Sequence, residues 1–139
     1  MKLLLAPRHL AILHRHARAS YPAECCGFLV GRVRGTAKVI ARVAPARNEA
    51  AESSRHRYLI SPQAYFHAEC DARGRGLTVL GFYHSHPEAA AEPSEEDRTR
   101  ALPGLSYVVV AVRGGEPGEL RSWVLAEDRM RFDPEPLGG

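Results

Sequence analysis

The sequence predicts an α/β fold, in which helices flank a mixed or mostly antiparallel sheet. Short β-like runs recur along the chain, segments with helical periodicity separate some of them, and tight turns join others into hairpins. The chain has 139 residues, of which 45% are hydrophobic and 25% charged, which is typical of one globular domain with a single core. We therefore expect one layered domain.

The first half of the chain predicts a helix, a hairpin and a long loop. Residues 7–19 combine a proline suited to a first helical turn with apolar residues at helical spacing. Residues 26–33 form a β-like run, and residues 38–44 alternate as its hairpin partner after a glycine turn. Residues 45–56 are polar and alanine-rich, and we expect a flexible surface loop there.

The second half predicts the remaining strands and helices. Ser61 is suited to cap a helix that starts with Pro62 and continues to about Arg73. A short helix follows at residues 94–102. The expected strands are 58–60, a buried strand at 77–83 that ends at His84, a central strand at 107–112, a returning strand at 120–125 and an edge strand at 130–132.

Composition restricts the compartment and the partners. Residues 1–133 hold every predicted element, and residues 134–139 are expected to form a flexible C-terminal tail. Apolar runs are too short for a signal peptide or a membrane span, and three cysteines fit a reducing compartment, so we expect a cytoplasmic protein without a membrane partner. The net charge is +3, but arginines are spread along the chain, which argues against a nucleic-acid partner.

One stretch carries the pattern of a metal site. His84 and His86 are two residues apart, so an extended backbone directs both imidazoles to the same side. Pro87 ends the strand, and Ser94–Asp97 has the form of a capping box, which places Asp97 in the first turn of a helix. Two imidazoles and one carboxylate are typical of a catalytic zinc that keeps a coordination position open.

The residues alone leave the metal and the reaction open. Cupin and amidohydrolase sites need a further histidine, and none follows His86. An iron(II) oxygenase with two histidines and one carboxylate is chemically compatible with the ligand set. A hydrolase also needs a general base, and Glu24, just before an apolar strand, is the candidate.

Glu24 with Gly27 and the pattern His-x-His-Pro-x6-Ser-x2-Asp resembles the JAMM zinc metallopeptidases of the MPN-domain family, in their small standalone prokaryotic branch. The resemblance implies an MPN-like (cytidine-deaminase-like) sandwich. It also implies one Zn²⁺ per chain bound by His84, His86 and Asp97. Glu24 would act on the zinc-bound water as base and then acid, and Ser94 would polarise the scissile carbonyl and stabilise its oxyanion.

The same resemblance implies a function. Small members of the family resemble isopeptidases or amidases that cut after the C-terminal Gly-Gly of ubiquitin-like proteins, including sulfur carriers of cysteine, thiamine and molybdopterin biosynthesis. Residues 45–56 correspond by analogy to an insertion that helps to hold this tail. The alternative is a non-catalytic MPN module that binds such partners. The substrate and the number of subunits, including a homodimer, stay open.

Cys25 and Cys26 follow the candidate base, and a redox or metal role is one interpretation of that position. We favour the other interpretation, in which both are buried cysteines that behave as small hydrophobic residues.

Overall fold

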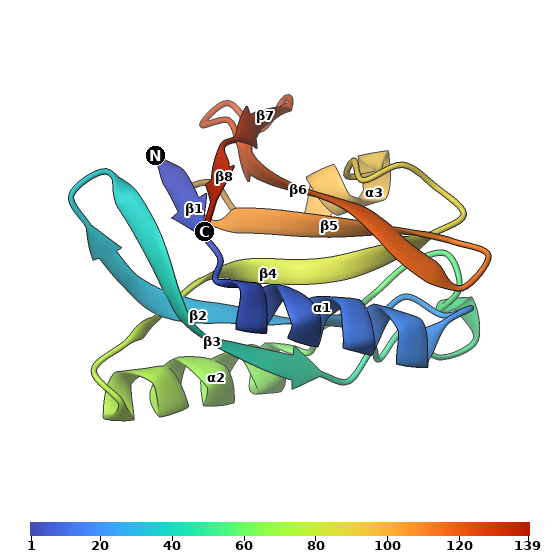
Figure 1. Cartoon of the computed structure of the whole chain (residues 1–139), viewed down its shortest axis with the longest axis horizontal. Coiled ribbons are helices and arrows are strands. Elements are labelled where there is room, and N and C mark those ends of the chain that lie inside the picture. The colour runs from blue at the N-terminus through green and yellow to red at the C-terminus, as the bar shows by residue number, and fades with distance from the viewer.

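A computed structural model describes all residues, 1–139. It contains one sheet of eight strands in the order β7-β6-β5-β4-β2-β3-β1-β8 (Figure 1). The strands are β1 Lys2–Leu4, β2 Cys26–Arg34, β3 Ala37–Ala46, β4 Thr78–Pro87, β5 Ser106–Arg113, β6 Glu116–Leu125, β7 Phe132–Glu135 and β8 Leu137–Gly138. The helices are α1 Pro7–Ser20, α2 Pro62–Gly74, α3 Glu95–Arg100 and a 3-10 turn, η1, at Ala51–Ser53.

The sheet is mixed, as the sequence predicts. β2 pairs antiparallel with β3 and β4, and β6 pairs antiparallel with β5 and β7. The β4–β5, β1–β3 and β1–β8 pairs are parallel. The expected central strand, residues 107–112, lies in β5, whereas β4 and β2 occupy the two middle positions. An apolar run indicates that both faces of a strand are buried, and it does not indicate the position of that strand in the sheet. β5 is buried on both faces without being central.

Helices cover both faces of the sheet, which confirms the expected sandwich (Figure 1). Because side chains alternate along each strand, neighbouring residues belong to different cores. On one face, α1 packs Leu13 and Ala17 against Leu29, Tyr83 and Val110. On the other face, α2 packs against a core that includes Phe28, Val30, Ala72, Phe82, Tyr107 and Leu125.

The predicted helix starts agree with the structure because local signals set them. Pro7 is the first residue of α1, and Ser61 caps α2 by accepting a hydrogen bond from Ala64 N at 3.1 Å. Two short elements differ from the prediction. β1 was not expected, and residues 58–60 pair with no strand, so they are not part of the sheet.

The expectation of a flexible tail at residues 134–139 is also wrong in this structure. β7 extends through Glu135, and after Pro136 the chain enters β8, which pairs with β1. Leu3 N donates to Pro136 O at 2.9 Å, and Leu5 N donates to Gly138 O at 2.8 Å. Backbone hydrogen bonds hold this segment, and amino-acid composition does not predict such bonds.

The C-terminal segment also joins the two edges of the sheet. β7 and β8 are consecutive in the chain but lie at opposite ends of the strand order, so the sheet curls until its edges meet. A buried ion pair stabilises the closure: Lys38 Nζ of β3 lies 3.0 Å from Glu135 Oε2. Lys38 also donates to Ser106 Oγ at 2.7 Å, and Ser122 Oγ donates to Glu135 Oε1 at 2.8 Å.

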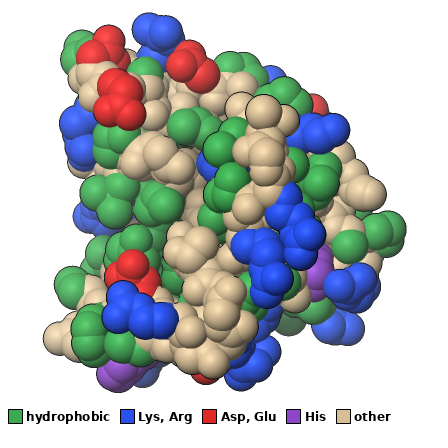
Figure 2. Space-filling view, turned by 90° about the vertical axis from the view of Figure 1, so that its left-hand side faces the viewer, with side chains coloured by type: hydrophobic (Ala, Val, Ile, Leu, Met, Phe, Trp, Pro, Cys, Tyr) green, Lys and Arg blue, Asp and Glu red, His purple; other side chains and the backbone are tan.

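Figure 2 shows the end of the molecule that forms the left-hand side of Figure 1, where lysine and arginine side chains lie among hydrophobic and acidic ones. None of the helices combines the length and the apolar character needed to cross a membrane.

Candidate active site

The two histidines of the motif lie within β4, which extends three residues beyond the predicted His84 boundary. Alternation places His84 and His86 on the face that α2 covers, and Ser85 on the opposite face. Ser85 Oγ accepts a hydrogen bond from Cys25 N at 2.8 Å, which ties β4 to the start of β2. The two imidazole centroids are 5.5 Å apart. The strand therefore presents both rings together, as the spacing predicts.

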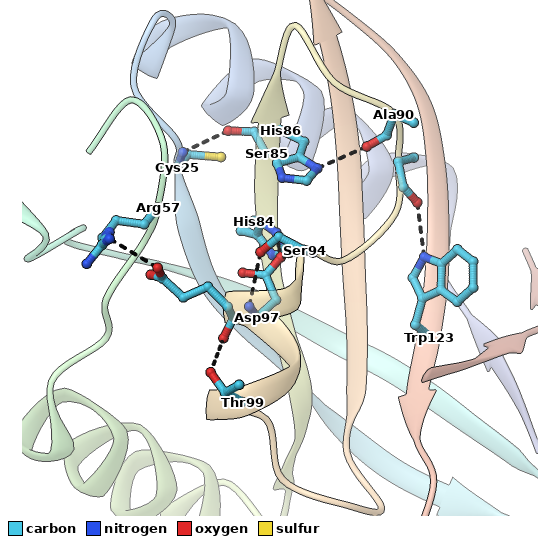
Figure 3. A network of polar contacts seen from close by, with 12 residues as sticks. Cys25, Arg57, His84, Ser85, His86, Ala90, Ser94, Asp97, Thr99 and Trp123 are labelled. Carbon is cyan, nitrogen blue, oxygen red and sulfur yellow. Dashed lines mark hydrogen bonds and ion pairs between the residues drawn. The ribbon is translucent and has the colours of Figure 1, made fainter. Parts of the chain in front are cut away.

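Asp97 reaches the histidines from the first turn of α3 (Figure 3). The predicted capping box is confirmed: Asp97 N donates to Ser94 Oγ at 3.0 Å, and Ser94 N donates to Asp97 Oδ2 at 2.7 Å. The same Oδ2 atom lies 3.2 Å from His84 Nε2. Burial alone would raise the pKa of Asp97, but His84 and Ser94 outweigh it and hold this pKa at about 2. The carboxyl is therefore charged at neutral pH.

These three side chains fit a zinc ion. One ligand atom from each of His84, His86 and Asp97 lies within 4.8 Å of the others. Two ligands at 2.0–2.1 Å from a tetrahedral zinc lie about 3.3 Å apart, close to the 3.2 Å between His84 and Asp97. His84 Nε2 is buried and faces Asp97 Oδ2 without a well-aligned hydrogen bond, as two ligands of one cation would.

Glu24 lies just before β2, where that strand runs beside β4. Cys26 is the register partner of His84, so continuing the pairing by two residues places Glu24 beside His86 on the histidine face. Its side chain is only 3% exposed, and Oε1 has no hydrogen-bond partner. Burial, followed by the charges of Asp97 and Glu96, raises the pKa of Glu24 to about 8. A carboxyl with this pKa exchanges a proton near neutral pH, as a general acid or base must.

Tyr58 is a site residue that the sequence analysis missed. Its ring stacks on His84, with the centroids 4.4 Å apart and the planes 23° from parallel. The packing restricts the orientation of the imidazole. Nothing in the sequence near Tyr58 indicates the contact, because His84 is distant in the chain and residues 58–60 do not pair with the sheet.

Asn48 is the second missed residue, and it organises the loop expected to be flexible. Its Nδ2 donates to Glu24 O and to Arg57 O, each at 3.0 Å. Its Oδ1 accepts from Ala50 N at 3.0 Å and from Leu59 N at 3.1 Å. One amide thus connects the loop to the backbone of the candidate base and to the segment that carries Tyr58.

An apolar groove with a volume of about 470 Å³ leads to Asp97. Arg57 Nη2 lies 3.1 Å from Glu96 Oε1, and this ion pair connects the chain just before Tyr58 to α3 (Figure 3). The groove is lined by Tyr58, Leu59, Ile60, Ser61, Pro62, Tyr65, Phe82, Glu96, Asp97, Arg100, Leu102 and Tyr107.

Cys25 and Cys26 are both buried, and burial raises their thiol pKa values to about 11 and about 12. Both thiols are therefore protonated at neutral pH, which is typical of cysteines that pack as small hydrophobic residues.

Comparison with known proteins assigns the chain to a family. Residues 6–126 match the model of prokaryotic homologs of the JAB domain. The chain belongs to this family. A TtuB-protein conjugate cleaving protease of Thermus thermophilus, named as probable, is 32% identical over 126 residues, which cover 90% of this chain and 78% of that protein.

Two further relatives of this JAB-family chain match over shorter stretches. The desampylase of Haloferax volcanii is 37% identical over 94 residues, 67% of this chain and 66% of that protein. Tail tip assembly protein K of Escherichia phage N15 is 40% identical over 85 residues, 61% of this chain and 30% of that protein. The chain thus spans less than two thirds of the length of either relative.

Solved structures share the fold of this chain. A protein from Desulfitobacterium hafniense is 31% identical and superposes with a TM-score of 0.83, covering 97% of this chain and 90% of that one. A JAB1/MPN domain protein from Archaeoglobus fulgidus covers 100% of both chains with a TM-score of 0.56. Its 17% identity makes it evidence for the MPN fold alone.

Proposed function

We propose that this protein is a zinc-dependent isopeptidase or amidase that hydrolyses the bond after the C-terminal Gly-Gly of a ubiquitin-like or sulfur-carrier protein. The observation that carries the proposal is the convergence of His84, His86 and Asp97 beside the buried Glu24, in a chain of the JAB family. Two relatives support it, since one is named desampylase and another a probable protease of TtuB-protein conjugates.

Each polar group at the site has a role in this reaction. His84, His86 and Asp97 would hold the zinc, which when bound would lower the pKa of water and polarise a carbonyl. Glu24 takes up a proton from the attacking water and delivers it to the leaving amine. Ser94 Oγ accepts from Asp97 N, so its own hydroxyl proton remains to donate to the developing oxyanion.

The groove beside Asp97 supports an extended peptide as substrate. Its lining is mainly apolar, which suits the hydrophobic residues of a tail, and it includes the candidate ligand Asp97. Two glycines present no side chains, so their backbone can lie close to the groove wall next to the scissile bond. The loop built around Asn48 borders the groove through Tyr58 and Leu59.

The test combines metal analysis with cleavage of a conjugate. We expect about one zinc per chain, and cleavage after Gly-Gly detected by mass spectrometry with candidate carrier proteins. Glu24→Gln should keep the zinc and lose about 100- to 10,000-fold in turnover, because the base is removed and the ligands are retained. Full turnover in Glu24→Gln, or after complete chelation, would exclude the mechanism.

The same experiment separates the alternatives. A non-catalytic module would bind a ubiquitin-like carrier with equal affinity in the wild type and in Glu24→Gln, and neither would release a product. Iron in place of zinc in the purified protein would favour an oxygenase site.

A further inference from the structure

His86, the second histidine of the site, has a hydrogen-bond partner at its ring nitrogen Nδ1. His86 Nδ1 lies 3.0 Å from the backbone oxygen of Ala90 (Figure 3). A carbonyl oxygen only accepts hydrogen bonds, so Nδ1 carries the proton in the neutral ring. The lone pair is then on Nε2, which is the atom left to bind a metal. The position of the Ala90 carbonyl therefore selects the tautomer of His86.

Ala90 belongs to the loop between β4 and α3, and the adjacent residue anchors that loop. Ala91 is fully buried, and its backbone oxygen accepts a hydrogen bond from Trp123 Nε1 at 3.0 Å. Trp123 lies in β6 and is 9% exposed. Figure 3 shows the two contacts in sequence, from the indole to the loop and from the loop to the imidazole.

Further contacts hold the same loop. Arg121, two residues before Trp123 on the same face of β6, places its guanidinium 4.5 Å from the indole centroid. Arg121 also lies 3.7 Å from Glu92 of the loop. At the start of the loop, Glu88 Oε1 accepts from Tyr21 OH at 2.8 Å and from Gly114 N at 2.7 Å. The loop is thus held at its start and near Glu92, and between them the buried Ala91 is hydrogen-bonded to the indole.

We propose that Trp123 is a positioning residue for the metal ligand His86, acting through the Ala90–Ala91 backbone. The indole N–H holds Ala91, which keeps the Ala90 carbonyl where it selects the Nδ1–H tautomer of His86. Partners of this kind behind a metal ligand typically contribute about 10- to 100-fold in metal affinity. The proposal rests on the zinc centre of the proposed function.

The test uses Trp123→Phe, which keeps an aromatic ring in the core and removes the N–H donor. In the metal-free protein at alkaline pH, ¹⁵N-labelled histidine spectra should show one His86 tautomer in the wild type and a mixture in the variant. The zinc dissociation constant should rise about 10- to 100-fold. Excess zinc should then restore most of the turnover, as expected for a residue that acts through a ligand.

Ser122→Ala is the matched control. Ser122 is the neighbouring residue of β6, it is buried, and its hydrogen bond goes to Glu135 on the other side of the strand. This variant should lose stability while His86 keeps its tautomer and the zinc affinity stays unchanged. A single tautomer and wild-type zinc affinity in Trp123→Phe would overturn the proposal.

A second variant covers the case in which Trp123→Phe does not fold. Arg121→Met removes the cation above the indole and the contact with Glu92, and it should weaken zinc binding in the same direction by a smaller factor. Unchanged affinity in Arg121→Met would then overturn the proposal. A wild type that binds no zinc contradicts the proposed function instead, whereas the tautomer comparison in metal-free protein tests the link from Trp123 to His86 separately.

Discussion

At the residue scale, the environment of Glu24 changes the chemistry of an ordinary carboxyl. Burial and the nearby charges of Asp97 and Glu96 raise its pKa from 4.5 to about 8. Its Oε1 atom has no hydrogen-bond partner to offset the burial of a charge. The metal-free protein therefore favours the protonated form of Glu24, whereas a general base must give up that proton before it can act.

This shift predicts how stability depends on pH in the metal-free protein. The folded chain keeps the Glu24 proton up to about pH 8, while the unfolded chain releases it near pH 4.5. Between these values the folded state binds more protons, so the free energy of unfolding falls as pH rises through the window. With chelator present, the Tm of the wild type should fall by ~5 °C more than the Tm of Glu24→Gln when the pH is raised from 5 to 8. Parallel pH curves for the two proteins would contradict the pKa shift.

At the scale of elements, local sequence signals fix the helix starts, whereas contacts with distant segments fix the loop after β3. The starts of α2 and α3 are readable from Ser61-Pro62 and from the capping box of Ser94 and Asp97, since each signal acts within one turn. The loop predicted at residues 45–56 begins only after Ala46, the last residue of β3, and it is different, because its order depends on one amide that bonds to segments before and after it. Its polar composition indicates only a loop.

The loop predicts a large effect for one substitution. Asn48→Ala removes four hydrogen bonds, and we expect the free energy of unfolding to fall by about 2 kcal/mol. Amide hydrogen exchange should accelerate at Ala50 and Leu59, whose N–H groups lose their acceptor. Ser53→Ala is the control, because it removes a single hydrogen bond to Ala50 O within the same loop. Equal effects of the two variants would argue against Asn48 as the organiser.

At the scale of the whole molecule, the buried ion pair of Lys38 and Glu135 connects two distant strands of the curled sheet. Both side chains are at most 8% exposed, and the pair joins strands from opposite halves of the strand order. Lys38 also bonds Ser106, and Glu135 also bonds Ser122, so each charge has a second partner. The closure explains why residues 134–139 contribute to β7 and β8 of the sheet.

Removing one partner of this pair should be costly. Lys38→Met leaves the Glu135 carboxylate buried without its cation, and we expect a loss of about 3–5 kcal/mol in urea unfolding. The double variant Lys38→Met/Glu135→Leu should recover most of that loss, because two apolar side chains leave no buried charge. A single variant as stable as the wild type would show that the pair does not hold the closure.

The sequence by itself determined the mixed α/β class, the helix starts, the two-residue spacing of His84 and His86, and the capping box that directs Asp97 toward them. These features depend on interactions within a few residues, so the local pattern contains them. Only the tertiary structure decided that Asn48 holds the loop, that Tyr58 stacks on His84, that Trp123 supports the loop behind His86, and that the C-terminal residues close the sheet. Each of those contacts depends on strand register and sheet curvature, which join distant segments and leave no local signal.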